Sequence, residues 1–276
     1  MKFYKAFSVF GLMLAAALLI NACSNSSEKE KDSIAKIKER GVLRVGVFSD
    51  KPPFGFVNTQ GQYEGFDVYI AKRLAKDLLG DEKKIEFIPV EAAARVEFLK
   101  SGKVDIIMAN FTKTKEREEV VDFATPYMKV ALGVVSKNGK IKNVDELKGK
   151  QLIVNKGTTA DFYFSKNYPE INLLKYDQNT EAFLALKNGR ANALAHDNTL
   201  LFAWAKENPG FVVSISSLGD QDVIAPAVKK GDKDLLDWLN EEIKVLTKEG
   251  FMKQAYDATL APIYGTDINP ASVIFE

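Results

Sequence analysis

The fold is decided by a short stretch that reads Val42-Leu43-Arg44-Val45-Gly46-Val47, placed just before the turn-forming Ser49-Asp50-Lys51-Pro52-Pro53. Its apolar and β-branched residues predict a buried strand. Farther along the chain, apolar residues recur at helical spacing over residues 66–79, and Gly80 follows as a C-cap. A buried strand followed by an amphipathic helix is the unit from which α/β folds are built.

The same alternation continues through the rest of the chain. Further predicted strands cover residues 84–90, 104–109, 127–136, 151–154, 172–176, 191–195 and 223–229. Further predicted helices cover residues 92–100, 115–121, 159–167, 179–188, 198–207, 232–248 and 250–257, and the tail 262–276 is expected to be loop. Two such runs predict an α/β fold with two lobes, each a mostly parallel sheet flanked by helices. We expect residues 34–133 and 225–276 to form lobe 1 and residues 134–224 to form lobe 2.

The charges of the chain nearly cancel, because 38 basic residues face 37 acidic ones among 276 residues and the formal net charge is +1. This balance gives no support for a nucleic-acid surface or a polybasic membrane surface. The chain has one cysteine, Cys23, and one histidine, His196. An intrachain disulfide, a Cys-based zinc site and a metal cluster with two imidazoles are therefore excluded, and we expect no metal and no cofactor.

The first 22 residues have the features of a signal peptide. Two lysines precede an uncharged, almost wholly apolar run over residues 6–20, which is too short to span a bilayer comfortably. The run ends in Ile20-Asn21-Ala22-Cys23, which resembles a bacterial lipobox, and a polar stretch follows. We expect residues 1–22 to be removed, Cys23 to carry diacylglyceryl and further acyl chains such as palmitate, and residues 23–33 to form a flexible tether. The protein would then be lipid-anchored in the cell envelope, facing the periplasm or the extracellular side. An ordinary secretory signal or an uncleaved anchor helix is the alternative.

A candidate anion site follows the strand that ends at Ala109. The sequence continues Asn110-Phe111-Thr112-Lys113-Thr114-Lys115-Glu116-Arg117, with a helix expected from Lys115. Ligands of open α/β sheets bind beyond the carboxyl ends of strands, where helix N-termini offer free N–H groups to an anion. Arg117, in the first turn, can add a bidentate guanidinium contact to a carboxylate. In the alternative interpretation, Thr114 is a plain N-cap and Arg117 is a solvated surface residue.

Two polar groups occupy equivalent places in the second run. The segment Asn155-Lys156-Gly157-Thr158-Thr159 joins a strand to a helix that opens at Thr159, so its amides and hydroxyls can also face an anion, although capping alone would explain them. The pair His196-Asp197 follows the predicted strand 191–195. Asp197 can pair with an ammonium group, or it can simply cap the next helix. Neither the Walker-loop spacing nor a Gly-x-Ser-x-Gly nucleophile elbow occurs.

Five motifs together resemble the polar amino-acid receptors of bacterial ABC importers, the family 3 solute-binding proteins. The motifs are Gly65-Phe66-Asp67-Val68-Tyr69-Ile70-Ala71-Lys72-Arg73-Leu74-Ala75, Phe111-Thr112-Lys113-Thr114-Lys115-Glu116-Arg117, Val121-Asp122-Phe123-Ala124-Thr125-Pro126-Tyr127, Lys156-Gly157-Thr158-Thr159 and Val228-Lys229-Lys230-Gly231-Asp232. Tyr69 departs from the family pattern, which usually has an acid there. The resemblance covers nearly the whole chain after Cys23 and implies a type II periplasmic-binding-protein fold with the ligand in the cleft between its lobes.

The resemblance also implies roles for single residues. Arg117 and Thr112 would hold the α-carboxylate of an L-amino acid, with help from the backbone N–H of Thr159. Asp197 would hold the α-ammonium group. Such a protein is a receptor rather than an enzyme. It would act as a monomer that passes its ligand to an ABC-transporter permease and would bind no nucleic acid.

Three other residues are candidates for side-chain selectivity. Lys51 stands where many relatives have an aromatic platform, Arg95 matches an arginine that meets acidic side chains in some relatives, and His196 adjoins Asp197. A closer likeness to the cysteine-binding surface lipoproteins of the family rests on residues 51–56, 95–100, 174–181 and 196–204. Cysteine is therefore the first choice of ligand, with glutamate, aspartate and glutamine as alternatives.

Two alternatives belong to other functional classes. A dehydratase-like enzyme on this scaffold would need a general acid in the cleft with a raised pKa, for which Glu91 and Glu97 are the only candidates we can name. A surface adhesin, in which amino-acid binding is incidental, is the second.

Overall fold

The computed structural model describes residues 32–276. The predicted signal peptide, the predicted lipidation site Cys23 and nearly all of the predicted tether lie outside the described residues. Helix α1 (Ser33–Arg40) begins at Ser33, the last residue of that predicted tether. Between residues 32 and 276, no helix has the length and apolar character needed to cross a membrane.

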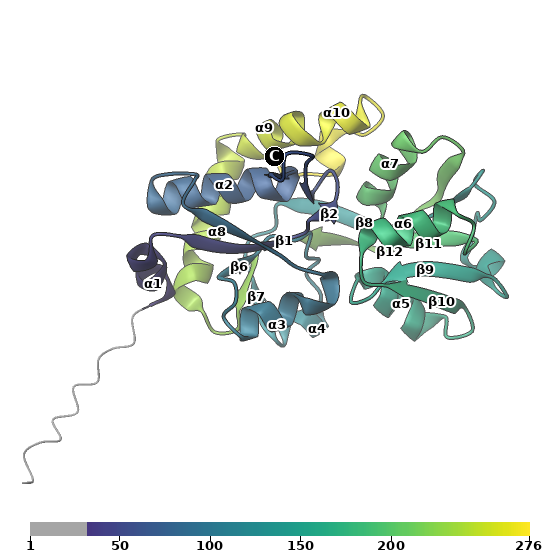
Figure 1. The fold of residues 1–276 in the computed structure, drawn as a ribbon, viewed down its shortest axis with the longest axis horizontal. Coiled ribbons are helices and arrows are strands. Elements are labelled where there is room, and N and C mark those ends of the chain that lie inside the picture. The colour runs from purple at the N-terminus through teal and green to yellow at the C-terminus, as the bar shows by residue number, and fades with distance from the viewer. Residues whose placement is uncertain (1–31) are drawn as a thin grey trace, which may run out of the picture. The chain divides into compact units, whose positions relative to one another are not determined.

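Two five-stranded sheets organise the body (Figure 1). The first has the order β5 (Ile85–Pro89), β1 (Leu43–Val47), β6 (Ile106–Ile107), β13 (Ala227–Lys229), β7 (Val121–Phe123). The second has the order β10 (Asn172–Tyr176), β9 (Gln151–Asn155), β11 (Ala193–Asp197), β8 (Met128–Lys137), β12 (Phe211–Ile224). We call the part built on the first sheet lobe 1 and the part built on the second sheet lobe 2.

The two sheets share one pattern of strand directions. In lobe 1, β5, β1 and β6 are parallel, β13 is antiparallel to β6, and β7 is antiparallel to β13. In lobe 2, β10, β9 and β11 are parallel, β8 is antiparallel to β11, and β12 is antiparallel to β8. Four of the five strands in each sheet therefore point the same way, so the prediction of mostly parallel sheets is confirmed. The carboxyl ends of these strands form an edge at which polar side chains can gather.

Helices cover both faces of each sheet, with α2 and α3 on opposite sides of the first and α6 and α5 on opposite sides of the second (Figure 1). The α-helices after α1 are α2 (Phe66–Leu79), α3 (Arg95–Lys100), α4 (Lys115–Glu118), α5 (Thr159–Asn167), α6 (Asn179–Lys187), α7 (Asn198–Glu207), α8 (Lys233–Lys248), α9 (Phe251–Thr259) and α10 (Ala261–Tyr264). Short 3-10 helices cover Ala92–Ala94, Val144–Leu147 and Pro270–Ser272. A small antiparallel sheet is formed by β2 (Asp50–Lys51), β3 (Gly55–Val57) and β4 (Tyr63–Glu64).

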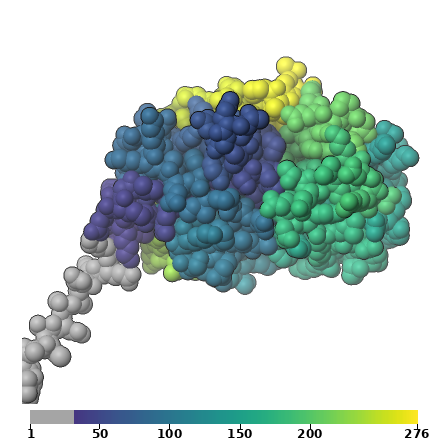
Figure 2. Space-filling model, viewed as in Figure 1, coloured from purple at the N-terminus to yellow at the C-terminus, as the bar shows by residue number. Residues whose placement is uncertain are grey.

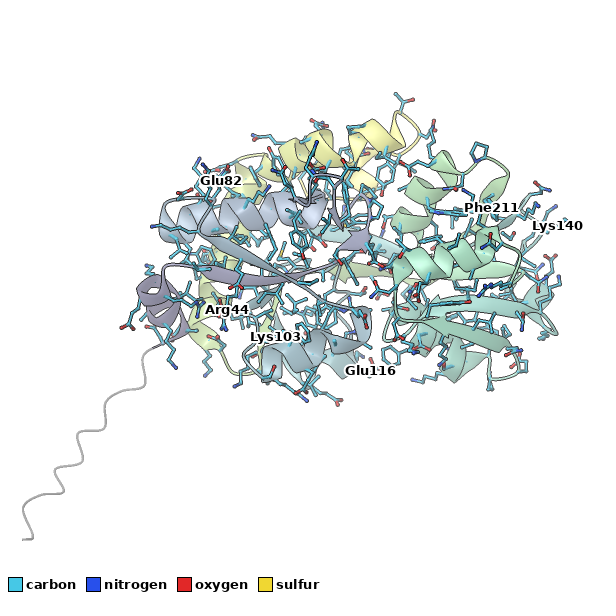
Figure 3. All side chains as sticks on the ribbon, in the orientation of Figure 1. Arg44, Glu82, Lys103, Glu116, Lys140 and Phe211 are labelled. Carbon is cyan, nitrogen blue, oxygen red and sulfur yellow. The ribbon has the colours of Figure 1, made fainter. Side chains whose placement is uncertain are left out.

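Helix α2 shows how local sequence and packing agree. Its residues Phe66, Ile70 and Leu74 lie one turn apart and are fully buried in the core that also contains β1. Burial of each such side chain stabilises the fold by about 1.5–3 kcal/mol. Gly80 ends the helix in the left-handed region at φ 80°, where its N–H donates to the carbonyl of Lys76. By contrast, the charged side chains of Glu82, Lys103 and Lys140 are exposed, and Glu82 and Lys140 lie at the periphery in Figure 3.

The long strands β8 and β12 lie side by side and connect the lobes (Figure 1). Their pairing has three register shifts, so β12 bends along its length. At the lobe 1 end, Tyr127 N–H donates to the carbonyl of Ile224 at 3.0 Å and Ala225 N–H donates to that of Phe111 at 3.3 Å. The two lobes are in contact on the face shown in Figure 2. The division at residues 133/134 and 224/225 stays a prediction.

Several elements differ from the sequence-based predictions. The helix expected over residues 115–121 ends at Glu118, because Val121–Phe123 pairs with β13 as strand β7. The strand expected over 104–109 shrinks to Ile106–Ile107. The strand expected over 223–229 is two strands, since Pro226 lies between β12 and β13 and has no N–H for a ladder. The tail expected to be loop holds α10 and a 3-10 turn, whereas most of β12 and the small sheet were not predicted.

Candidate functional site

A small cavity lies between the lobes at the carboxyl ends of the strands. Both lobes contribute residues to its lining. The residues of lobe 1 are Phe48, Lys51, Arg95, Asn110, Thr112 and Arg117, and those of lobe 2 are Thr158, Thr159 and Asp197. About 10 Å³ is open to the centre of a water-sized sphere, which leaves room for about one water molecule. Six of the seven ligand-binding residues predicted from sequence meet here. The seventh, His196, does not line the cavity.

Arg117 reaches the cavity from the first turn of α4. Thr114 caps this helix, its hydroxyl accepting from the N–H of Arg117 at 3.3 Å. The guanidinium is nevertheless buried, with only 7% of the residue exposed, so the alternative of a solvated surface arginine is wrong. One guanidinium nitrogen donates to the carbonyl of Thr112 at 2.6 Å and the other to the carbonyl of Gly157 at 2.9 Å. Arg117 therefore spans from lobe 1 to lobe 2.

Arg95 and Arg117 both lie over the ring of Phe111. The guanidinium carbon of Arg95 is 4.3 Å from the Phe111 ring centroid, and that of Arg117 is 4.8 Å from it. Cation–π attraction to the electron-rich ring of Phe111 stabilises both guanidinium groups. Arg95 donates to the carbonyls of Ala92 at 2.9 Å and of Gly157 at 3.2 Å. All of its hydrogen bonds are thus to neutral oxygens.

Lys51 and Asp197 form a buried ion pair across the lobes. The ammonium nitrogen is 3.1 Å from Oδ2 of Asp197, and the residues are 1% and 3% exposed. Lys51 also lies 5.1 Å from the ring centroid of Phe48. Asp197 occupies the N-cap position of α7, yet its side chain makes no capping hydrogen bond. The capping alternative is therefore wrong, and the carboxylate faces the cavity.

His196 lies behind Asp197 as the penultimate residue of β11. The strand extends over residues 193–197 instead of the expected 191–195, so both residues belong to the strand rather than to the loop after it. The Nδ1 atom of His196 accepts from the backbone N–H of Asp197 at 2.7 Å. Burial lowers the pKa of His196 below its ordinary value, and Lys51 lowers it further. The ring is therefore neutral near pH 7, so its 3.4 Å approach to the Asp197 carboxylate is not an ion pair.

Gly157 and Thr159 shape the lobe 2 side. Gly157 has φ 74°, and a Cβ there would lie 2.6 Å from the backbone of Ala93, so only glycine allows this close approach of the lobes. The Thr158 hydroxyl then caps α5 by accepting from Asp161 N–H at 3.3 Å. Because Thr159 is the first helical residue, its N–H has no partner within the helix and can serve an anion in the cavity.

The lining carries three cations and one carboxylate. Burial lowers the pKa of Arg95 well below its ordinary value, and the nearby Arg117 lowers it further. Burial likewise lowers the pKa of Arg117 to about 10 and lowers that of Lys51, with Asp197 opposing both shifts. Burial alone would raise the pKa of Asp197, but the Lys51 charge and the interactions with His196 and Lys51 together outweigh burial and hold this pKa well below its usual range. Basic groups thus outnumber acidic ones in the lining, and an added anion would oppose the lowering of their pKa values.

Sequence reasoning missed Asn110. This residue follows β6 with φ 46°, a left-handed conformation that asparagine tolerates better than most residues. Its N–H donates to Asp67 at 2.7 Å, and the hydroxyl of Tyr127 donates to the same carboxyl at 2.7 Å. The Asn110 Oδ1 atom is buried and has no hydrogen-bond partner among residues 32–276. It is thus an acceptor available at the cavity wall. Phe48 was also missed, whereas Thr158 belongs to the segment 155–159 whose hydroxyls were expected to face an anion.

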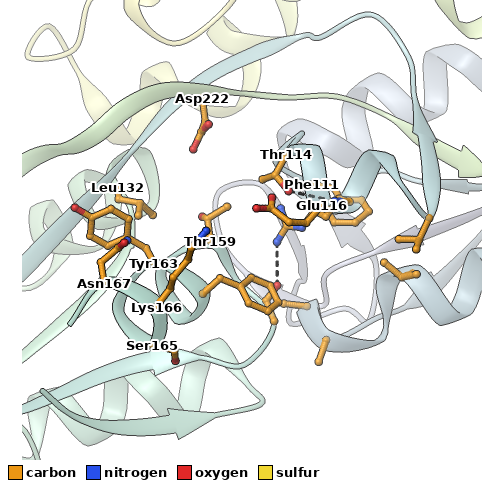
Figure 4. A pocket seen from close by; sticks show the side chains of 17 residues that line it. Phe111, Thr114, Glu116, Leu132, Thr159, Tyr163, Ser165, Lys166, Asn167 and Asp222 are labelled. Carbon is orange, nitrogen blue, oxygen red and sulfur yellow. Dashed lines mark hydrogen bonds between the residues drawn. The ribbon is translucent and has the colours of Figure 1, made fainter. Parts of the chain in front are cut away.

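A larger groove of about 780 Å³ adjoins the cavity and shares Arg117 and Thr159 with it. Figure 4 shows Tyr163, Lys166 and Asn167 of α5 on one side and Thr114 and Glu116 on the other. Most of the surface of this groove is apolar, so the side chains suited to binding a charged ligand lie mainly in the small cavity. In the described part of the chain, no group of three His, Cys, Asp or Glu residues is placed to hold a metal ion.

The rim of the lobe interface has its own hydrogen bonds. Asp50 of β2 accepts from the backbone N–H of Asn179 at 2.6 Å, from its side-chain amide at 2.9 Å, and from Thr180 N–H at 3.3 Å. The N-cap residue of α6, Gln178, makes no capping bond with its side chain and instead donates to Glu91 at 2.6 Å. A carboxylate of lobe 1 therefore caps a helix of lobe 2.

Known proteins that are similar to this chain in sequence and structure are solute-binding proteins. The model of the bacterial extracellular solute-binding proteins, family 3, matches residues 43–260. The solute receptor for L-cysteine of Neisseria gonorrhoeae is 60% identical, with a TM-score of 0.87 over 88% of this chain and 99% of that one. The cysteine-binding protein of Campylobacter jejuni is 57% identical, with a TM-score of 0.88 over 89% and 100% of the chains.

A relative named for a different ligand is also similar. The ABC transporter glutamine-binding protein GlnH of Bacillus subtilis is 36% identical over 262 residues, which is 91% of this chain and 96% of that protein. The type II periplasmic-binding-protein fold expected from sequence is confirmed. The chain therefore belongs to the bacterial extracellular solute-binding proteins of family 3.

Proposed function

We propose that this protein is a lipid-anchored receptor that binds a small polar L-amino acid, with cysteine as the first choice, and delivers it to an ABC-transporter permease. One observation carries the proposal: a buried arginine of lobe 1 and a buried carboxylate of lobe 2 face the same small cavity. An amino acid carries the matching pair of charges on adjacent groups. A site that needs both lobes is suited to closing on its ligand.

Each end of the zwitterion has a partner in the cavity. Arg117 and Thr112 would hold the α-carboxylate together with the N–H of Thr159, and Asp197 would hold the α-ammonium group. A carboxylate accepts several hydrogen bonds, so the ligand can bind Asp197 beside Lys51. Charge-assisted bonds contribute about 1.5–3 kcal/mol each, and three or four of them support micromolar binding after the cost of association.

The similarities support cysteine as the ligand more than glutamine. The two cysteine-binding structures share a much larger fraction of residues with this chain than the glutamine-binding relative does. Arg95 and Lys51 supply cations for the ligand side chain, which keeps glutamate and aspartate as alternatives. His196 would act only indirectly, by fixing the backbone of Asp197.

An enzyme on this scaffold has less support. Glu91 and Glu97, the candidate general acids, are both exposed and neither lines the cavity. We therefore propose that the protein is a monomeric receptor without catalytic activity. Anchoring through Cys23 stays part of the proposal and is tested by incorporation of labelled fatty acid into the wild type and its loss in Cys23→Ser.

A thermal-shift screen of the twenty amino acids and cystine tests the proposed function. Ligand binding raises apparent stability by mass action, so cysteine at 100 to 1,000 times Kd is expected to raise Tm by about 5–15 °C. Arg117→Ala should abolish the shift, whereas Lys115→Ala, an exposed residue of the same helix, should keep it. The absence of a shift with every amino acid would contradict the proposal.

A further inference from the structure

The cations of the cavity outnumber its anions by two. Lys51, Arg95 and Arg117 line it together with the single carboxylate of Asp197. Of these cations, only Lys51 has a carboxylate partner within the cavity. Arg95 donates to four backbone carbonyls, those of Ala92, Ala109, Asn110 and Gly157, and to no carboxylate among the described residues. Buried charges of one sign are costly unless an opposite charge accompanies them.

The backbone of an amino acid does not correct this imbalance. Its α-carboxylate takes Arg117 and its α-ammonium takes Asp197, so the zwitterion adds no net charge. Lys51 and Arg95 would then share one carboxylate with the ligand ammonium. A ligand side chain with a negative charge offsets part of this surplus, and a neutral side chain does not.

Asp67, Tyr127, His196 and Asp222 are ionisable groups just outside the lining. Asp67 lies behind Asn110, and burial raises its pKa to about 7, so it is partly protonated near neutral pH. Its hydrogen-bonding partner Tyr127 has a pKa raised well above its ordinary value by burial and stays neutral. His196 is neutral as well. Asp222 faces Arg117 from the larger groove and has a pKa raised by burial. None of these groups places a full negative charge beside Lys51 and Arg95.

We propose that the cavity binds cysteine as its thiolate, with the ionised sulfur held by Lys51 and Arg95. This inference rests on the proposed function and adds the ionisation state of the ligand. A free thiol has a pKa near 8.5, so about a few per cent of it is ionised at pH 7. Neighbouring Lys and Arg lower a thiol pKa to roughly 3.5–7.5. The surplus cations of the cavity therefore favour the thiolate, and cysteine has the smallest side chain that can supply it.

The proton balance of binding is simple. The S–H bond of cysteine breaks heterolytically, the electron pair stays on sulfur, and the proton passes to the solvent buffer or to Lys51 where that amine is unprotonated. No electrons are transferred and no co-reactant is required. Because the proton has two destinations, the decisive readout is the ionisation state of sulfur rather than proton release.

Ultraviolet difference spectroscopy tests this state directly, since a thiolate has an absorbance band that a thiol lacks. The test uses the full chain with Cys23→Ser, in which the ligand supplies the only thiol because Cys23 is the one cysteine of the sequence. Titration with cysteine at pH 7 is expected to raise the thiolate absorbance until one equivalent is bound. Serine and S-methylcysteine, which cannot ionise at this atom, are expected to bind at least tenfold more weakly.

Two variants separate the contribution of the cations from general effects. Arg95→Met is expected to reduce the thiolate absorbance per bound cysteine, whereas Lys140→Met, at the far edge of lobe 2 (Figure 3), should leave it unchanged. Cysteine bound without the thiolate band, or serine bound as tightly as cysteine, would overturn the inference and leave the receptor function standing. Binding of glutamate or aspartate but not cysteine would likewise overturn it. No binding of any amino acid would instead refute the proposed function.

Discussion

The lobes meet in two regions of opposite chemistry, the rim and the cavity. At the rim, Asp50 of lobe 1 caps helix α6 of lobe 2, and Glu91 accepts from Gln178. Every donor in these contacts has an acceptor supplied by the protein. In the cavity, three cations share one carboxylate, and the Asn110 Oδ1 acceptor has no partner among residues 32–276.

This difference indicates that the rim stabilises the closed form and that the cavity binds the ligand. The rim contacts stabilise closure whether or not a ligand is bound, because they are complete within the protein. The cavity gains its missing partners only from a ligand with both charges. Variants of the cavity should therefore change affinity strongly, and variants of the rim should change it through the closing equilibrium alone.

The largest effect is expected for Arg117→Ala. Removal of the buried guanidinium leaves the α-carboxylate without its main partner, which typically costs about 2–5 kcal/mol, so the Kd for cysteine should rise about 30- to 5,000-fold. Isothermal titration calorimetry measures this change, with Lys115→Ala as the control. An affinity within threefold of the wild type would remove Arg117 from the site.

Asp197→Asn should weaken binding next most strongly, by about 30-fold or more. The variant keeps the shape of the side chain but removes the charge that pairs with the α-ammonium group and with Lys51. An unpaired buried lysine also lowers the free energy of unfolding of the unliganded protein by several kcal/mol. Chemical denaturation and calorimetry measure the two effects. Asp220→Asn, an exposed residue of lobe 2, should show neither.

The raised pKa of Asp67, which lies behind the cavity, should make the free energy of unfolding depend on pH. The folded-state pKa of Asp67 of about 7 lies above its ordinary value of 3.8, so between these two pH values the folded protein holds a proton that the unfolded chain has released. Stability from this group therefore falls as pH rises from about 4 to about 7, by about 2 kcal/mol between pH 5 and 6.5. Asp67→Asn should remove this slope in urea denaturation, and the exposed Asp237→Asn should retain it. An identical slope in Asp67→Asn would show that another group is responsible.

Asp50→Ala at the rim is expected to have the smallest effect. Loss of a helix cap typically costs about 1 kcal/mol, and here the cost falls only on the closed form, so the Kd for cysteine should rise about 5-fold. The ligand preference should not change, because Asp50 does not line the cavity. Asp237→Ala is the control for calorimetry. A change in the order of preferred amino acids would contradict the separation of rim and cavity.

Local sequence predicted the regular elements well where periodicity and caps agree. The predicted bounds of helices α2, α5 and α7 equal the observed ones, since each combines an apolar period with a clear start or stop. Strand β12 was missed because its sequence mixes polar and apolar residues, and its register shifts break the two-residue alternation. Long-range pairing rather than local pattern determines such a strand.

The candidate site shows the same limit. Spacing and family resemblance located Arg117, Thr112 and Asp197 at the cavity. The Lys51–Asp197 pair joins residues 146 positions apart, and no local pattern specifies it. Asn110 was missed because its role depends on a left-handed backbone and on the buried Asp67 beneath it. The Lys51–Asp197 pair follows from the contact between the lobes, and the Asn110 conformation follows from packing of α2 against the end of β6.

A crystal structure of the protein with bound cysteine tests the central claim most directly. The account predicts one cysteine between the lobes, its α-carboxylate on Arg117, its α-ammonium within hydrogen-bond distance of Asp197, and its sulfur between Lys51 and Arg95. Cysteine bound in the larger groove, or with its sulfur directed away from both cations, would contradict the account.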